Sequence, residues 1–371
     1  MEIFEISFDN PHSVFHPGQN VTGNVRIRSE QALNALSLKI CVHGEATTHW
    51  KKFKNERKFD RQGKLRILSE HINFSSKIPY LEGVSKPWSS LNGSNKIPPG
   101  ENIFPFFFPL PPNCPPSFEG KCGSIRYSVH IELDRPWRVN AESKKVFSVI
   151  PIIDLMTIPK AINPMENHAC KHFGFFGTKE VKMKVNVPKR GYIPGEVIPI
   201  QILIENHAKK PIYSAKASLI QHVHYTAQQE HSHLFPREHD CHRHCDHKTA
   251  KVTVADTFKS VQVECCTKQQ IHIEVTVPQN GIPSFKTPII EMDYILLVKL
   301  EEKLDCEFPI VVGSVPIRNL TNVAIIPSYT EVTVDAPGAS EPPPEYKENV
   351  ETLPPEYTYS TAPSAPGIDH F

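Results

Sequence analysis

Apolar and polar residues alternate along much of this chain with a period of two, which is the spacing of side chains on the two faces of a β-strand. Glycine and proline interrupt the alternation at short intervals, and no stretch offers an apolar stripe of helical spacing over three turns. The pattern therefore predicts an all-β fold in which half-buried strands pack as two-sheet sandwiches. The clearest alternating positions are Val21, Val25 and Ile27; Leu36, Leu38, Ile40 and Val42; Tyr127, Val129, Ile131 and Leu133; Val181, Met183, Val185 and Val187; and Ile271, Ile273, Val275 and Val277.

Short fragments of the first half of the chain return in the same order in the second half. The matching fragments are 15–21 with 192–198, 116–118 with 283–285, and Tyr127 with Tyr294. This duplication predicts two consecutive, homologous, immunoglobulin-like sandwiches joined by a connector that prolines stiffen. The predicted boundaries are 1–152 for the first lobe, 153–167 for the connector, 168–318 for the second lobe and 319–371 for a tail.

The tail has a different composition from the lobes, because it is rich in proline, serine, threonine and glutamate and has little to bury. Such a segment cannot offset its ordering entropy, so we expect it to be disordered. It contains two P-P-x-Y motifs, in which a proline pair pre-forms an extended helix and a tyrosine follows. This combination fits the aromatic-lined groove of a WW domain. The predicted WW-binding residues are Pro343, Pro344 and Tyr346, and Pro354, Pro355 and Tyr357.

Composition and charge narrow the class of protein. The formal net charge of +1 argues against a nucleic-acid binder. The amino terminus lacks the basic and apolar regions of a signal peptide, and no apolar run is long enough to span a bilayer. We therefore expect a cytosolic protein whose nine cysteines, an odd number, are reduced thiols.

Residues 51–66 form a basic segment with eight basic and two acidic residues. One interpretation is a solvated hairpin. The other is a contact with an anion, either lipid of the inner leaflet or a phosphorylated cargo tail. The candidate contact residues are Lys51, Lys52, Lys54, Arg57 and Lys58.

A second unusual segment, residues 231–247, is rich in histidine and cysteine and is predicted to be a long loop between strands. Its candidate metal ligands are His239, Cys241, His244 and Cys245, which offer the nitrogen and sulfur atoms that zinc binds. The alternative is adventitious metal binding by a surface loop, because no second ligand pair stands at a zinc-finger spacing. We therefore expect no cofactor.

Two other features bear on chemistry. The neighbouring pair Cys265 and Cys266 is predicted to lie on a strand, with one side chain pointing inward and one outward. No nucleophile elbow, phosphate-binding loop or zinc-protease motif occurs, so we expect no enzymatic activity.

Several fragments together resemble the arrestin superfamily, and in particular the arrestin domain-containing proteins, or α-arrestins. These fragments are Phe8-Asp9-Asn10, Phe15-His16-Pro17-Gly18, Leu133-Asp134-Arg135-Pro136-Trp137 and the stretch from Arg190 to Ile198. The resemblance implies a two-lobed arrestin fold and a non-enzymatic adaptor. Such adaptors link membrane receptors or transporters, as cargo, to HECT-type ubiquitin ligases that carry WW domains.

The resemblance also implies a cytoplasmic protein that associates peripherally with the plasma membrane and endosomes. It identifies Pro363, Ser364, Ala365 and Pro366 as a motif that contacts the endosomal sorting complex. The sequence departs from the family pattern at Ile326-Pro327-Ser328-Tyr329, where Ile326 replaces the first proline of a further P-P-x-Y.

Two other functions are compatible with a two-lobed chain of this kind. A redox-linked regulator would capture thioredoxin through an exposed thiol such as Cys241 or Cys245. A cargo carrier similar to retromer subunits would share the fold, but it would have no need of P-P-x-Y motifs.

Overall fold

The computed structural model describes residues 2–59, 65–90, 96–173, 179–230, 244–301 and 304–318. The chain divides into a compact unit, Met1–Asn319, and a second unit, Leu320–Phe371, which lies outside the described residues. The predicted disorder of the tail therefore concerns residues that the structure does not describe. Within the described ranges the fold is all-β, as the alternation predicts, and the helical element there is the short 3-10 helix η2 (Leu155–Thr157).

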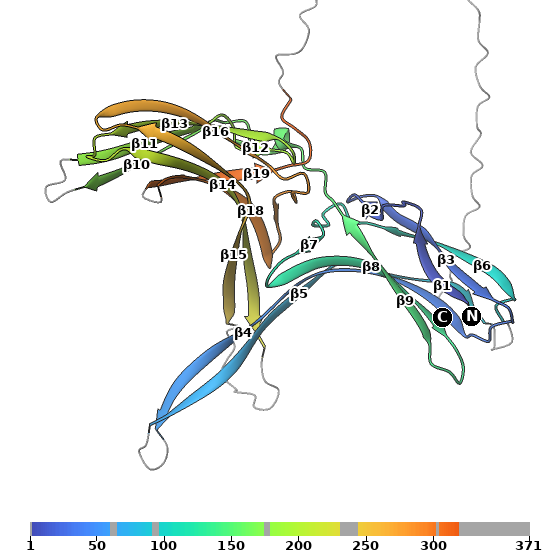
Figure 1. Cartoon of the computed structure of the whole chain (residues 1–371). Helices are drawn as coiled ribbons and strands as arrows, with labels where there is room; N and C mark the ends of the chain where they lie inside the picture. Colours follow the sequence, from blue (N-terminus) through green and yellow to red (C-terminus); the bar gives the residue numbers. More distant parts are fainter. Residues whose placement is uncertain are drawn as a thin grey trace, which may run out of the picture. The chain divides into compact units, whose positions relative to one another are not determined.

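The first lobe is a sandwich of two sheets (Figure 1). One sheet has the order β1-β3-β6, and the other contains β5, β4, β8, β9 and β2, with β7 paired to β8. Its strands are β1 (Ile3–Phe8), β2 (Val14–Phe15), β3 (Asn20–Ser29), β4 (Ser37–Phe59), β5 (Leu65–Ser89), β6 (Gly100–Pro109), β7 (Phe118–Glu119), β8 (Gly123–Asp134) and β9 (Ala141–Val149).

The core of the first lobe comes directly from the alternating pattern. Val25 on β3, Ile40 on β4 and Ile131 on β8 are each fully buried, while their neighbours along each strand are less buried. A two-residue period places every second side chain between the sheets, where removal of apolar surface from water stabilises the sandwich.

The second lobe repeats this arrangement. Its first sheet has the order β10-β11-β13-β16, and its second contains β12, β19, β18 and β14, with β15 on β14 and β17 on β18. Its strands are β10 (Met165–Phe173), β11 (Lys179–Val187), β12 (Gly191–Tyr192), β13 (Val197–Asn206), β14 (Ile212–Gln229), β15 (Cys245–Val263), β16 (Thr267–Thr276), β17 (Phe285–Lys286), β18 (Ile290–Leu300) and β19 (Leu304–Val312).

The predicted duplication is visible in the backbone as well as in the sequence. Phe15 of β2 and Tyr192 of β12 each belong to a two-residue strand that pairs in parallel with the last strand of its lobe. The turns that follow place Gly18 at φ 86° and Gly195 at φ 84°, a left-handed conformation that glycine adopts without steric cost. The two Pro-Gly turns therefore have the same backbone conformation and the same position in each lobe.

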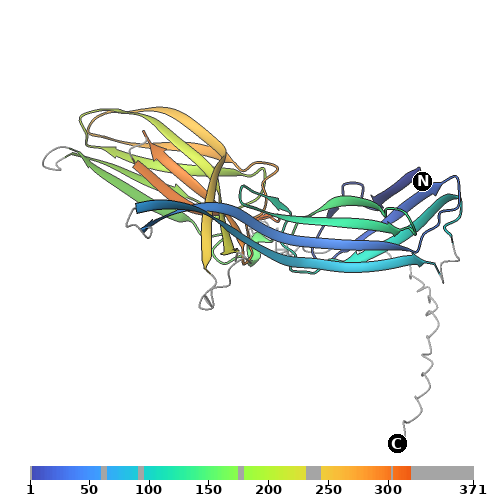
Figure 2. The same cartoon turned by 90° about the horizontal axis from the view of Figure 1, so that it is seen from below.

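The hairpin of β4 and β5 is much longer than one lobe requires, with strands of 23 and 25 residues. Figure 2 shows these two strands in blue shades running side by side. Midway along the hairpin, Ser75 and Phe74 of β5 pair with Gln228 and Gln229 of β14. This short antiparallel ladder joins the second sheets of both lobes into one 12-stranded sheet.

The connector assigned to residues 153–167 is held by hydrogen bonds as well as by its prolines. Ile153 exchanges backbone and side-chain hydrogen bonds with Ser314, and Asp154 caps η2 by accepting from the amide of Met156 at 2.9 Å. Leu155 is fully buried. Strand β10 begins at Met165, inside the segment assigned to the connector.

Candidate interaction surface

The outer part of the long hairpin carries an aromatic pair on its buried face. Trp50 of β4 and Phe74 of β5 face one another across the hairpin, with ring centroids 6.2 Å apart and planes 20° apart. They are only 4% and 3% exposed. Trp50 continues the buried positions Ala46 and Thr48, so the two-residue period of β4 extends beyond the first lobe.

Asp246 of β15 lies against this aromatic pair and binds two side chains of β4. The indole Nε1 of Trp50 donates to Asp246 Oδ2 at 2.8 Å, and the ammonium of Lys52 pairs with Oδ1. Lys52 also lies 5.8 Å from the centroid of Phe74. The two strands are therefore joined by one carboxylate that satisfies an indole and an ammonium together.

This arrangement determines the charge state of Asp246. Burial on its own would raise the pKa of the carboxyl, but the hydrogen bonds from Lys52 and Trp50 outweigh burial and hold the pKa below its ordinary value. A further cation, Lys248, lies 5.6 Å from the centroid of Trp50. The cluster of Trp50, Phe74, Lys52, Asp246 and Lys248 is called the hairpin clasp below.

The hairpin clasp changes how the basic segment is interpreted. Lys51 is exposed, whereas Lys52 is engaged by Asp246. Lys54, Arg57 and Lys58 belong to β4, but their side chains lie outside the described residues. The segment is a hairpin, as one interpretation requires, and contact with an anion stays a prediction that concerns Lys51 more directly than Lys52.

The candidate metal ligands of the histidine-rich segment fall partly outside the described residues. His239 and Cys241 lie in that undescribed part. His244 precedes β15 with its ring 6.4 Å from that of Phe74, and Cys245 is exposed at the first position of β15. The end of the predicted loop is therefore a strand, because Cys245 and Asp246 pair with Gln228 and Ala227.

Within the described ranges, one group of three potential metal ligands does lie close together, and it is elsewhere. Cys170 and His172 of β10 and Glu180 of β11 place one ligand atom each within 4.8 Å of one another. The sequence patterns used above did not identify this group, because it depends on the pairing of two strands.

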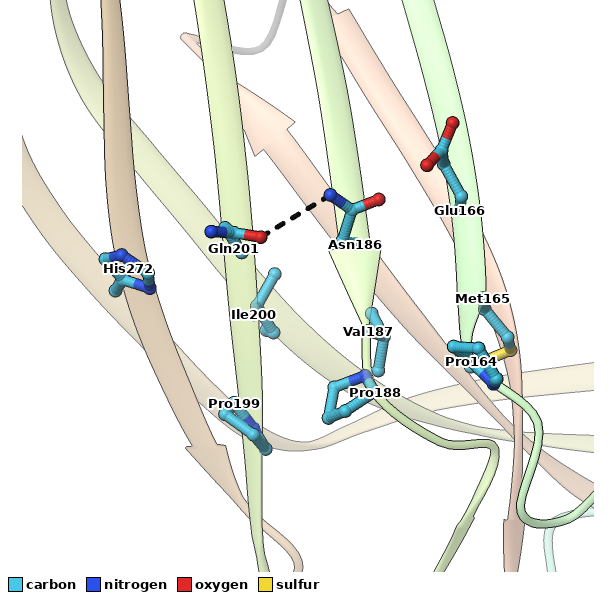
Figure 3. A pocket seen from close by; sticks show the side chains of 10 residues that line it. All are labelled: Pro164, Met165, Glu166, Asn186, Val187, Pro188, Pro199, Ile200, Gln201 and His272. Atoms are coloured by element: carbon cyan, nitrogen blue, oxygen red, sulfur yellow. Dashed lines mark hydrogen bonds between the residues drawn. The ribbon is translucent and has the colours of Figure 1, made fainter.

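A groove of about 550 Å³ lies across β10, β11, β13 and β16 (Figure 3). Three prolines line one end of it, Pro164, Pro188 and Pro199, and Asn186 donates to Gln201 at 3.5 Å. Its carboxylate, Glu166, and its imidazole, His272, lie on opposite sides in the view. The groove therefore does not assemble an acid–base pair from these two groups.

Comparison with known families matches both lobes. Residues 4–156 match the arrestin (or S-antigen) N-terminal domain, and residues 177–317 match the arrestin (or S-antigen) C-terminal domain. The chain belongs to the arrestin family. Its relatives place it among the arrestin domain-containing proteins, or α-arrestins, so the resemblance stated from sequence fragments is confirmed.

Three relatives illustrate this similarity. The chain is 26% identical over 330 residues to Arrestin domain-containing protein 17 of Caenorhabditis elegans. The aligned region covers 85% of this chain and 71% of that protein. It is 26% identical over 327 residues to Arrestin domain-containing protein 1 of Homo sapiens, and the aligned region covers 86% of this chain and 66% of that protein. It is also 26% identical over 355 residues to Arrestin domain-containing protein 4 of Homo sapiens, and the aligned region covers 92% of this chain and 79% of that protein.

Membership of the arrestin family supports an adaptor role in general, and it is consistent with a protein that performs no chemistry. The described part of the chain contains no helix that is long and apolar enough to cross a bilayer. The P-P-x-Y motifs and the P-S-A-P motif at Pro363–Pro366 lie outside the described residues. Their role therefore rests on the sequence alone.

Proposed function

We propose that this arrestin-family protein is a trafficking adaptor that links membrane-protein cargo to WW-domain ubiquitin ligases of the HECT class. The observation that carries the proposal is the occurrence of two complete P-P-x-Y motifs in one α-arrestin chain. Pro343, Pro344 and Tyr346 are one anchor, and Pro354, Pro355 and Tyr357 are the other. Ubiquitin transfer then follows from proximity, and the adaptor itself supplies no catalytic group.

The separation of the two anchors supports binding to two WW domains at once. Tyr346 and Tyr357 are eleven residues apart. An extended polyproline segment of this length reaches about 34 Å, and a flexible coil averages roughly 18 Å. Both values suit adjacent WW domains in one ligase, and simultaneous engagement raises the apparent affinity by about 10²–10⁴.

The lobes supply the other half of the adaptor. They engage the cytoplasmic face of a receptor or transporter, and exposed basic side chains such as Lys51 favour an anionic lipid surface. We place the protein in the cytoplasm, peripherally at the plasma membrane and endosomes. The segment Pro363–Pro366 then directs the complex to the endosomal sorting complex.

Capture of the full chain by a purified tandem of WW domains tests the proposal. We expect Tyr346→Ala or Tyr357→Ala to reduce the affinity toward that of one motif, and the double variant to abolish capture. Tyr329→Ala is the matched control, because its motif already lacks the first proline. Capture of the double variant at the level of the unaltered chain would refute the proposal.

A further inference from the structure

The edge strand β10 displays an unusual set of side chains on its outward face. His168, Cys170 and His172 are all exposed and stand two residues apart, so the pleat directs them to the same side. Ala169, between two of them, packs against the core. A thiol and two imidazoles therefore share one solvent-facing row at the edge of the second lobe.

The antiparallel register brings a carboxylate to this row from the next strand. Glu180 of β11 is the direct partner of His172, and Lys182 is the direct partner of Cys170. Cys170 Sγ lies 3.5 Å from Glu180 Oε2 and 3.7 Å from His172 Nε2. His172 Nδ1 lies 3.7 Å from the same carboxylate oxygen. Sulfur, nitrogen and oxygen donors thus converge from two strands.

Lys182 fixes the carboxylate in the orientation that this convergence needs. Its ammonium lies 2.5 Å from Glu180 Oε1, so the other oxygen, Oε2, faces the thiol and the imidazole. The hydrogen bond from Lys182 also holds the pKa of Glu180 below its ordinary value. An ionised carboxylate is therefore presented to Cys170 and His172.

We infer that Cys170, His172 and Glu180 form a Zn²⁺ site on the β10–β11 ladder. Zinc bonds of about 2.3 Å to sulfur and about 2.0–2.2 Å to nitrogen and oxygen put neighbouring tetrahedral ligand atoms about 3.3–3.6 Å apart. Cys170 Sγ and Glu180 Oε2 already stand at such a separation, 3.5 Å. The two 3.7 Å separations involve different nitrogens of His172, Nε2 toward the thiol and Nδ1 toward the carboxylate, and one ligand atom from each of the three residues lies within 4.8 Å of the other two. The imidazole therefore has to turn so that a single nitrogen faces both partners. Thiolate with imidazole selects zinc over magnesium or calcium, which prefer oxygen ligands.

The site has three protein ligands and faces solvent, so the fourth position of the ion holds water or a ligand from a bound partner. Zinc bound here joins the edge strand to its neighbour just before the chain leaves β10. Binding also releases a proton, because the metal takes the thiolate and not the thiol. Zinc affinity should therefore increase with pH.

Zinc titration of the full chain, stripped of metal with a chelator, tests this inference. The histidine-rich segment is a second candidate, so the starting protein is the variant Cys241→Ser with Cys245→Ser. We expect it to bind one equivalent of Zn²⁺, and to give a thiolate-to-cobalt absorption band when Co²⁺ replaces zinc. Adding Cys170→Ser should remove the band, and adding His172→Asn should weaken zinc binding by at least about tenfold.

Cys266→Ser is the matched control, since Cys266 is also an exposed cysteine of the second lobe but lies in the turn between β15 and β16. It should leave both the band and the affinity unchanged. Circular dichroism of each variant verifies that the β fold is retained. A cobalt band that survives Cys170→Ser, or zinc binding that disappears when only Cys241 and Cys245 are replaced, would overturn the assignment.

Discussion

Tyr127 and Tyr294 make the same hydrogen bond in the two lobes. Each hydroxyl donates to a backbone carbonyl twelve residues upstream, that of Pro115 at 2.8 Å in the first lobe and that of Ile282 at 2.9 Å in the second. Both rings are almost completely buried. The alignment of these tyrosines in the sequence therefore reflects a shared structural role, in which one buried hydroxyl satisfies the carbonyl of a crossing loop.

Replacing either tyrosine with phenylalanine should destabilise its lobe. The ring remains, but the backbone carbonyl loses its donor, which costs about 0.5–1.5 kcal/mol and more if water cannot reach the carbonyl. Thermal unfolding of the full chain measures the effect. We expect Tyr127→Phe and Tyr294→Phe to give losses of similar size, and a loss in only one lobe would contradict equivalent roles.

The same two tyrosines should also make the chain sensitive to alkali. Burial raises the pKa of Tyr127 far above its ordinary value and that of Tyr294 to about 12. A raised pKa means that stability is complete below the unfolded-state value of about 10 and is lost as pH rises through the folded-state value. The free energy of unfolding should therefore fall above pH 10, and less steeply in each phenylalanine variant.

Much of the fold could be predicted because it depends on local pattern. Alternation along β3, β8 and β11 fixes which side chains enter the core, and the duplicated Pro-Gly turns mark where each lobe begins. The pattern failed where a turn replaced a strand. Cys265 and Cys266 lie in the turn between β15 and β16, with Cys266 at φ 58°, so the prediction of a strand there was wrong.

The hairpin clasp could not be predicted for a different reason. Trp50 and Asp246 are 196 residues apart, and their hydrogen bond exists only because β14 pairs with β5 beside them. Cys170 and His172 have no recognised metal spacing either, and their third partner comes from the register with β11. The alternation of apolar and polar residues predicts which face of a strand a side chain occupies. Contacts between the lobes and between paired strands depend on which strands pair and in which register, and the alternation does not give this.

Removing the carboxylate of Asp246 should weaken the hairpin clasp. Asp246→Ala leaves the indole of Trp50 and the ammonium of Lys52 without their acceptor, at a cost of about 1–3 kcal/mol. Asp246→Asn should cost less, because an amide oxygen can still accept from the indole. Urea unfolding of the full chain measures both, and equal effects would show that charge rather than the indole bond dominates.

Asp256→Asn is the matched control for this experiment. Asp256 pairs with Lys216 on the same two strands, β15 and β14, but the pair is exposed, so its loss should change stability by at most about 1 kcal/mol. The pH dependence differs too. Because the pKa of Asp246 is lowered, its contribution is present above the ordinary value near 3.8 and is lost as pH falls below it.

The connector should be sensitive to a single methyl group at Gly313. A Cβ there would lie 2.7 Å from Cγ and Cδ2 of Leu155 and 3.0 Å from the carbonyl oxygen of Ile153. Gly313→Ala should therefore destabilise the chain by about 1–3 kcal/mol through overpacking. Leu155→Ala should cost about 2–5 kcal/mol by leaving a cavity.

The double variant distinguishes overpacking from a general effect on the backbone. If the added methyl group clashes with Leu155, then Gly313→Ala should cost less in the Leu155→Ala background than in the unaltered chain. Thermal unfolding of the four proteins gives the coupling energy. Strictly additive losses would mean that the connector does not depend on this contact.

Charge reversal at Lys51 separates membrane attraction from the hairpin clasp. Lys51 is exposed, whereas Lys52 binds Asp246, so Lys52→Glu would both reverse charge and place two carboxylates together. If the outer hairpin contacts anionic lipid, Lys51→Glu should weaken binding of the full chain to phosphatidylserine vesicles, by about 1 kcal/mol for each charge removed from the surface. Raising the salt concentration should reduce the difference between the two proteins, because screening weakens attraction between exposed charges.

Lys259→Glu, a charge reversal on β15, serves as control and should have a smaller effect. Equal vesicle binding by the unaltered chain and Lys51→Glu at low salt would leave the basic hairpin as a solvated structure and remove Lys51 from the proposed membrane contact.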